Sequence, residues 1–227
     1  MPNVPIRPER VAHRGASRER RENTLPAFEL ALERGADAIE LDVHATADGV
    51  VVVHHDPAVQ GMAIARTGWR ELGRIVLPGG ARIPRLQDVL VSVAGGATVY
   101  IELKGAGCEG QAIAVAREFG HRYAVHSFDH AAIERAAAIA PDVPRGALID
   151  HGTPHAVKHL AEIVRRLRLR DVWPHHSLVD AEFVAAATAL GARVITWTVN
   201  EPDDARRFAA LGVSGICTDD VRLLANL

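Results

Sequence analysis

One stretch, Ala38-Ile39-Glu40-Leu41-Asp42-Val43, has the composition of a buried β-strand and yet carries two carboxylates. Side chains two apart on a strand point to the same face, so Glu40 and Asp42 face one side while the apolar residues pack on the other. Acids in a buried sheet need a partner, because an unpaired buried charge is costly. The stretch therefore predicts a strand of a buried sheet and one wall of a functional site.

A hairpin signal follows this stretch. Asp48-Gly49 is among the strongest two-residue turn sequences, and the apolar run 50–53 comes directly after it. If Asp48 and Gly49 form the loop, His55 lies opposite Asp42, and with the turn one residue earlier its partner is Glu40. Either register predicts a histidine beside the two acids.

Length and composition predict one globular domain over residues 1–227. The chain is 48% hydrophobic and 24% charged, and its formal net charge is −2 with a pI near 6.6. Nothing in this balance favours nucleic acid or an anionic membrane as a partner. The two cysteines, Cys108 and Cys217, lie far apart without metal-ligand spacing, which favours a reducing compartment over a disulfide framework.

The N-terminal residues 1–8 contain no apolar core of a signal peptide, and no stretch approaches the ~18 apolar residues of a membrane span. We therefore expect a cytoplasmic protein without stable membrane insertion.

Strand and helix patterns alternate along the whole chain. A short apolar strand at 11–13, a helical period at 25–34 and the strand at 38–43 fit within about 30 residues, which is typical of a βαβ unit and a parallel sheet. Further strands are expected at 98–103, 123–127, 145–149, 171–173, 193–199 and 214–218. Helices are expected near 86–94, 109–119, 130–139, 154–166, 180–190 and 202–211.

With 50–53 as the return arm of a hairpin, this pattern gives eight strand positions, the number that closes a (β/α)₈ TIM barrel. Residues 57–85 are rich in glycine and irregular, and we expect them to form a short insertion that lies over the catalytic face as a partial lid. Two helix caps are also expected: Asn23-Thr24 before the first helix, and Asp219 before the last.

Chemistry-bearing side chains follow the predicted strands at their carboxyl ends, where barrels of this kind build their sites. The candidates are His13, Arg14, Glu40, Asp42, His55, Glu102, Lys104 and Trp197.

Three carboxylates that converge in a barrel mouth repel one another unless a positive group sits among them. A hard divalent cation with oxygen ligands meets that need, and the absence of thiolates disfavours zinc. With Arg14 and Lys104, such a cation would bind an anion of dispersed charge, as a phosphodiester has. Two histidines without a paired serine or cysteine suit general acid and general base roles. The residues thus predict metal-assisted cleavage of a phosphodiester.

A series of motifs in the same order resembles the glycerophosphodiester phosphodiesterase family. The matching pieces are His13-Arg14-Gly15, Glu22-Asn23-Thr24, Gly35-Ala36-Asp37-Ala38-Ile39-Glu40-Leu41-Asp42-Val43, Thr46-x-Asp48-Gly49, His55-Asp56-Pro57, Ile83-Pro84-x-Leu86, Ile101-Glu102-Leu103-Lys104, Ser127-Phe128-Asp129, Trp197-Thr198-Val199-Asn200 and Gly212-Val213-Ser214-Gly215-Ile216-Cys217-Thr218-Asp219.

The resemblance implies a TIM barrel of the phospholipase C-like phosphodiesterase type and hydrolysis of glycerophosphodiesters to sn-glycerol 3-phosphate and an alcohol. It implies one divalent cation, Mg²⁺ or Ca²⁺, held by Glu40, Asp42 and Glu102. It also implies an acid-base pair, with His13 as base and His55 as acid. Arg14 and Lys104 would contact the phosphate, and Trp197 would form a wall of the substrate pocket.

Three features depart from the family pattern. The insertion at 57–85 is short, the loop after Lys104 is brief, and His126 stands where many members have glutamine. A reduced insertion exposes the mouth and leaves two alternatives open. One is a lysophospholipase D or sphingomyelinase D-like enzyme that acts on a lipid, and the other is a non-catalytic barrel that binds a phosphorylated metabolite.

Overall fold

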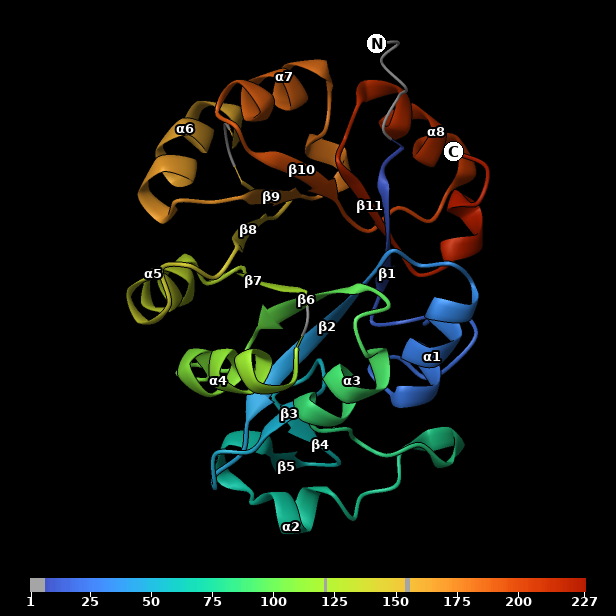
Figure 1. Ribbon diagram of the computed structural model, residues 1–227, viewed down its shortest axis with the longest axis vertical. Coiled ribbons are helices and arrows are strands. Elements are labelled where there is room, and N and C mark those ends of the chain that lie inside the picture. Colours follow the sequence, from blue (N-terminus) through green and yellow to red (C-terminus); the bar gives the residue numbers. More distant parts are fainter. Residues whose placement is uncertain (1–6, 121, 154–155) are drawn as a thin grey trace.

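A closed ring of eight parallel strands forms the centre of the protein (Figure 1). The computed structural model describes residues 7–120, 122–153 and 156–227. The ring is closed because the first strand pairs with both the last strand and the second. Its members are β1 (Glu9–His13), β2 (Ala38–Ala45), β6 (Thr98–Leu103), β7 (Tyr123–Ser127), β8 (Arg145–Ile149), β9 (Asp171–Pro174), β10 (Arg193–Thr196) and β11 (Gly215–Thr218). The predicted (β/α)₈ barrel is confirmed.

Helices lie around the outside of the ring and bury the outward-facing residues of the strands (Figure 1). They are α1 (Leu25–Glu33), α3 (Leu86–Val93), α4 (Glu109–Phe119), α5 (His130–Ile139), α6 (Ala156–Leu167), α7 (Ala181–Ala189) and α8 (Pro202–Leu211). Two short 3₁₀ helices, His176–Leu178 and Val221–Leu224, follow β9 and β11. The first two residues of the helix predicted from 154 lie outside the described part of the chain. Residues 1–6 of the N-terminal stretch lie outside it as well.

Aromatic side chains fill the interior of the ring. Tyr100 and Trp173 are fully buried there, with their rings 4.9 Å apart in an edge-to-face arrangement. The small residues Ala38, Ala124 and Gly146 on neighbouring strands leave room for them. A Cβ at Gly146 would stand 2.8 Å from the Trp173 indole, so the bulk of Trp173 requires a glycine on β8. The aromatic pair therefore closes the barrel beneath the site.

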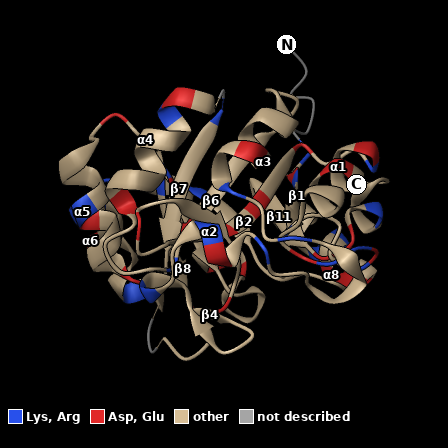
Figure 2. Ribbon diagram, turned by 90° about the horizontal axis from the view of Figure 1, so that it is seen from below, with Lys and Arg blue, Asp and Glu red and all other residues tan. Residues whose placement is uncertain are grey.

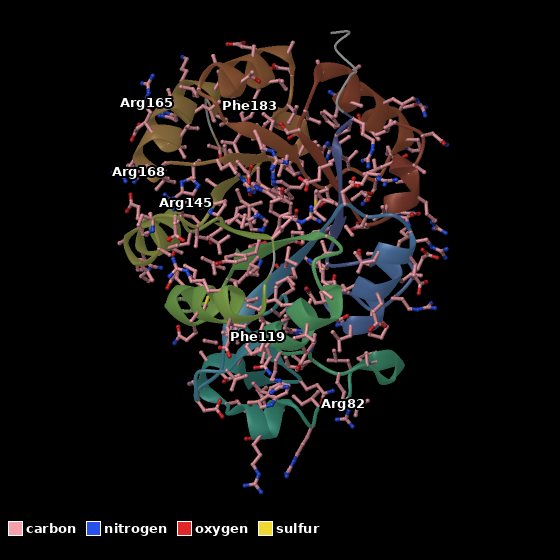
Figure 3. The ribbon with its side chains drawn as sticks, viewed as in Figure 1. Arg82, Phe119, Arg145, Arg165, Arg168 and Phe183 are labelled. Atoms are coloured by element: carbon pink, nitrogen blue, oxygen red, sulfur yellow. The ribbon has the colours of Figure 1, made fainter. Side chains whose placement is uncertain are left out.

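An ion-pair network seals the amino-terminal end of the barrel. Arg193 lies 2.6 Å from Glu9 and 3.5 Å from Asp171, and the Tyr100 hydroxyl donates to Glu9 at 2.6 Å. A further buried arginine, Arg145, lies between α5 and α6 in Figure 3 and donates to backbone carbonyls, among them that of Leu167 at 2.9 Å. These contacts fix the starts of four strands and leave the opposite end of the barrel for chemistry.

The hairpin after β2 forms, but its register is shifted from both predicted ones. The return strand β3 (Val51–Val53) pairs antiparallel with β2, with Val43 opposite Val53, and the loop has three residues because Thr46 bonds to Val50. His54 therefore lies opposite Asp42 and donates its backbone N–H to the Asp42 carbonyl at 2.9 Å. The prediction that His55 pairs directly with an acid is wrong by one residue.

The insertion at 57–85 packs beside the barrel. It contains β4 (Ala58–Val59), β5 (Met62–Ala63), α2 (Trp69–Leu72) and the 3₁₀ turns Ile64–Arg66 and Pro78–Gly80. Its apolar side chains gather on Val52 of β3 and form a small core of their own. Figure 1 shows these elements at the lower end of the molecule, and Figure 3 places Arg82 at that margin. The insertion thus packs against β3 through a core that includes Val52.

Charge and hydropathy of the folded chain agree with the composition. Figure 2 shows basic and acidic positions interspersed along the ribbon. Within the described residues, no helix combines the length and the apolar character that a membrane crossing demands.

The packing of Trp173 against Gly146 gives a stability prediction. Gly146→Ala is expected to lower the free energy of unfolding by ~1–3 kcal/mol, because the added methyl group overpacks the barrel interior. Urea denaturation followed by circular dichroism measures this change. Gly110→Ala on α4 is the matched control: a Cβ there meets no atom within 4 Å, so stability should stay constant or rise slightly. Equal stabilities of the two variants would contradict the proposed fit of the indole.

Candidate active site

A cavity of about 250 Å³ opens at the carboxyl ends of the barrel strands. All the predicted site residues line it except Asp42, which is fully buried beside it. None of its lining residues belongs to the insertion at 57–85. The partial lid stays a prediction. The lining residues are His13, Arg14, Glu40, His55, Glu102, Lys104, His126, Phe128, Leu148, Trp173, Trp197 and Cys217.

A left-handed turn after β1 brings Arg14 into the cavity wall. Arg14 has φ 58° and Gly15 has φ 83°, a conformation that glycine adopts without a steric cost. A Cβ at Gly15 would also stand 2.7 Å from the backbone of Ala27 on α1, so this turn requires glycine. The Arg14 backbone N–H donates to the Glu40 carbonyl at 2.9 Å, which ties the turn to β2.

Asp42 is held by three neighbours. Asn23 donates its side-chain amide to Oδ2 at 2.7 Å, Arg14 Nε lies 3.1 Å from the same oxygen, and Lys104 Nζ lies 3.6 Å from Oδ1. Burial opposes the charge of Asp42, but the two cations and the amide outweigh it and lower the pKa of Asp42. Asp42 therefore stays ionised although it is buried.

The pair Asn23-Thr24 was expected to cap α1, and the cap position is correct but neither side chain caps the helix. Thr24 occupies the N-cap position, and its side chain makes no capping bond. The Asn23 amide points to Asp42 instead, while Glu22 pairs with Arg14 at 3.0 Å. The run Glu22-Asn23-Thr24 thus positions two site residues, which a cap pattern could not indicate.

Glu102 is the acid of the site whose pKa is shifted upward. Burial, together with the Asp42 and Glu40 carboxylates, raises the pKa of Glu102 to about 8, although Lys104 donates to its Oε1 at 3.2 Å. In register, Asp42 lies beside Glu102 and Glu40 beside Tyr100 on the neighbouring strand, so β2 and β6 bring the acids together directly.

His13 is oriented by Asp219. Its Nδ1 lies 2.7 Å from Asp219 Oδ1, and Asp219 also accepts from Ser17 and Asn200. Burial alone would lower the pKa of His13, but the bond to Asp219 and the nearby Glu40 carboxylate raise it above its usual value. The expectation that Asp219 caps the last helix is wrong, because Asp220 makes that cap.

His55 approaches the cavity from the loop after β3. Its side chain is 35% exposed, against 20% for His13, and its Nδ1 lies 2.8 Å from Asp56. The His55 carbonyl is also within 3.1 Å of His44 Nε2, which anchors the loop to β2. One histidine therefore stands within the cavity wall and the other at its rim.

Aromatic rings form one side of the mouth. Trp197 packs edge-to-face with Phe128 at 5.3 Å and with His175 at 5.2 Å. Its indole N–H donates to the Trp173 carbonyl at 2.8 Å, so Trp197 presents ring surface to the cavity and no free donor.

Buried polar atoms without partners mark the place where a cation fits. Asp42 Oδ1 and both ring nitrogens of His126 are buried and find no hydrogen-bond partner in the part of the chain that the structure describes. Ligand atoms of Glu40, Glu102 and His126 all lie within 4.8 Å of one another. Unpaired lone pairs among carboxylates are what a divalent cation satisfies, so the residues present fit a metal ion. His126 was not among the predicted site residues, and its signals in the sequence were its place near the end of a barrel strand and its departure from the glutamine of many family members.

A parallel α/β barrel with histidines, acids and cations at its carboxyl end defines a barrel hydrolase for an anionic substrate. The model of the glycerophosphoryl diester phosphodiesterase family matches residues 13–223, and the chain belongs to this family. It is accordingly an enzyme of the phosphoric diester hydrolase class.

Relatives of known name and structure agree with this membership. A glycerophosphodiester phosphodiesterase of Caldanaerobacter subterraneus is 32% identical, and the match covers 96% of each chain. A crystal structure of a glycerophosphodiester phosphodiesterase from Agrobacterium tumefaciens is similar with a TM-score of 0.84 and 27% identity, over 96% of this chain and 98% of that one. A phosphodiesterase of Oleispira antarctica, solved in complex with the product sn-glycerol-3-phosphate, shares the fold with a TM-score of 0.85 at 24% identity, over 96% and 95% of the two chains.

The raised pKa of Glu102 predicts a pH-dependent stability. An unfolded glutamate ionises near pH 4.5 and the folded one only near pH 8, so the metal-free protein should lose stability as pH rises through this window. Glu102→Gln should remove most of that loss. Urea unfolding in chelator at pH 5 and pH 8.5 measures it, with the exposed Glu118→Gln as control. A wild-type pH slope that persists in the Glu102 variant would contradict the pKa assignment.

The His13 and Asp219 pair predicts a kinetic effect. Asp219→Asn should lower kcat by ~10²-fold or more with little change in KM, because the imidazole loses its fixed tautomer. The acid limb of the pH profile of kcat/KM should shift to lower pH, since the bond that raises the pKa of His13 is gone. Asp220→Asn, next in sequence but directed to Arg222, serves as the control. An unchanged pH profile in the Asp219 variant would refute this role.

Proposed function

We propose that the protein hydrolyses glycerophosphodiesters to sn-glycerol 3-phosphate and an alcohol in a reaction that requires a divalent cation. The observation that carries this proposal is the placement of His13 and His55 in one cavity with Arg14 and Lys104. The named activity of the Caldanaerobacter relative supports the reaction, and the product in the Oleispira structure supports the substrate class.

Glu40, Asp42 and Glu102 are proposed to hold the cation, Mg²⁺ or Ca²⁺. A bound ion would supply positive charge against the phosphoryl oxygens and would favour ionisation of the attacking hydroxyl. The protein's own contribution is to keep three acids in place on two adjacent strands, with Asn23 and Lys104 preventing them from moving apart.

His13 acts as the general base. Because Nδ1 is occupied by Asp219, the free nitrogen is Nε2, and it takes the proton of the attacking hydroxyl. That hydroxyl belongs to water or to the neighbouring carbon of the glycerol, and the second route passes through a cyclic phosphate. The Asp219 carboxylate stabilises the imidazolium that forms.

His55 acts as the general acid at the rim and protonates the leaving alkoxide. Its greater exposure suits a group that meets a variable alcohol. Arg14 and Lys104 offset the negative charge of the phosphoryl group, and Trp197 provides an apolar wall.

A lipid substrate has less support. Most apolar side chains of 57–85 on which an acyl chain would depend are engaged in the core of the insertion: Ile64, Leu72, Ile75 and Leu77 are buried, and Val76 alone among its large apolar side chains is exposed. The two cysteines are buried free thiols, which fits the reducing cytoplasm that we propose as the compartment.

An assay of glycerol 3-phosphate release from glycerophosphocholine and glycerophosphoethanolamine tests the proposal, with lysophosphatidylcholine as the lipid comparison. Activity should require a divalent cation and vanish in chelator, and His13→Ala and His55→Ala should each lower kcat by ~10²–10⁴-fold. The exposed His159→Ala on α6 should behave as wild type.

Turnover of the lysolipid alone would replace the proposed substrate with a lipid. A wild type that cleaves none of the three under any metal would refute the proposal and favour the non-catalytic binding barrel.

A further inference from the structure

His126 is the least satisfied polar side chain near the cavity. It lies on β7, is 1% exposed, and neither ring nitrogen has a hydrogen-bond partner among the described residues. A neutral imidazole carries one donor and one acceptor, and burying either without a partner is unfavourable. A protein keeps such a side chain when a bound group supplies a partner for the ring and so removes part of the cost.

The ring is held firmly in place by its neighbours. It stacks on Tyr100 with an interplanar angle of 8° and meets Trp173 edge-on at 4.3 Å between ring centres. These contacts fix the orientation of the ring and satisfy neither nitrogen. The aromatic floor of the barrel, formed by Tyr100 and Trp173, thus orients the imidazole toward the acids.

The carboxylates of Glu40 and Glu102 lie close enough to this ring for all three side chains to bind one ion. Glu102 and His126 are partners in register on β6 and β7, and His126 Nε2 lies 3.5 Å from Glu40 Oε1. The ligand atoms of these three residues lie within 4.8 Å of one another. Ligands that share one ion at ~2.0–2.3 Å stand at most ~4.6 Å apart, so only a small adjustment brings all three onto one ion.

We propose that His126 supplies a nitrogen ligand to the cation and thereby makes this a site that prefers a first-row divalent transition-metal ion, such as Mn²⁺, to Mg²⁺ or Ca²⁺. Hard cations prefer oxygen ligands alone, whereas an imidazole favours first-row transition ions. The inference rests on the metal dependence in the proposed function and replaces its choice of ion.

An ion pair is the competing account of the same geometry. A protonated His126 beside Glu40 would need no metal, and the 3.5 Å separation is compatible with it. That account predicts no bond between His126 and a metal. The two accounts therefore differ in an observable that does not depend on catalysis.

Pulsed EPR of Mn²⁺ added to the metal-free protein tests the inference. The wild type should show the ¹⁴N coupling of a directly bound imidazole, and His126→Gln should lose it while still binding Mn²⁺ through the carboxylates. In competition titrations, His126→Gln should lower the preference for Mn²⁺ over Mg²⁺ by ~10-fold or more. His159→Gln, the same change on an exposed face of α6, should alter neither quantity.

Mn²⁺ that binds without ¹⁴N coupling would overturn the inference, as would coupling that persists in His126→Gln. Either result leaves the proposed function standing if hydrolysis still requires a metal. An absence of both metal binding and turnover would refute the proposed function as well. Should His126→Gln fail to fold, His126→Asn is the second variant, and wild type grown with ¹⁵N-histidine should show the coupling changed to that of ¹⁵N.

Discussion

Repulsion among the acids of β2 and β6 is the constraint on which the rest of the site depends. A parallel barrel buries both faces of its strands, so carboxylates at alternate positions of β2 have no access to bulk water. Each neighbouring feature offsets part of the resulting charge. Arg14 reaches Asp42 because the turn after β1 is left-handed, Asn23 contributes an amide, and Lys104 follows Glu102 two residues later. Burial, together with the negative charge that these groups leave uncompensated, raises the pKa of Glu102.

The barrel is built so that this charge lies at one end only. Tyr100 and Trp173 fill the space beneath the acids, and the pairing of Arg193 with Glu9 closes the other end. An aromatic floor excludes water and strengthens every electrostatic contact above it. The same floor positions His126, so packing and charge are connected through a single layer of side chains.

Much of this arrangement is predictable from the sequence, because the carboxyl ends of parallel strands must meet. The alternation of strands and helices predicts the eight strands of the ring, and the period of two places Glu40, Asp42 and Glu102 on its inner face. Sequence reasoning fails where contacts join distant segments. Asp219 lies more than two hundred residues from His13, and the capping pattern of Asn23-Thr24 contains no sign of Asp42. The hairpin register differs by one residue, because Asp48 turns its side chain to Thr46 and Trp69 instead of completing a two-residue loop.

The insertion at 57–85 has a consequence for the distance between the two histidines. Its core is assembled on Val52, three residues before His55, and the backbone of Val53 donates to Pro84 at the far end of the insertion. His13, in contrast, is fixed by β11 through Asp219. The proposed base and the proposed acid are thus held by different parts of the fold, and the insertion supports the loop that carries His55. A change in its packing is expected to alter the distance between His13 and His55 without substituting any residue of the cavity.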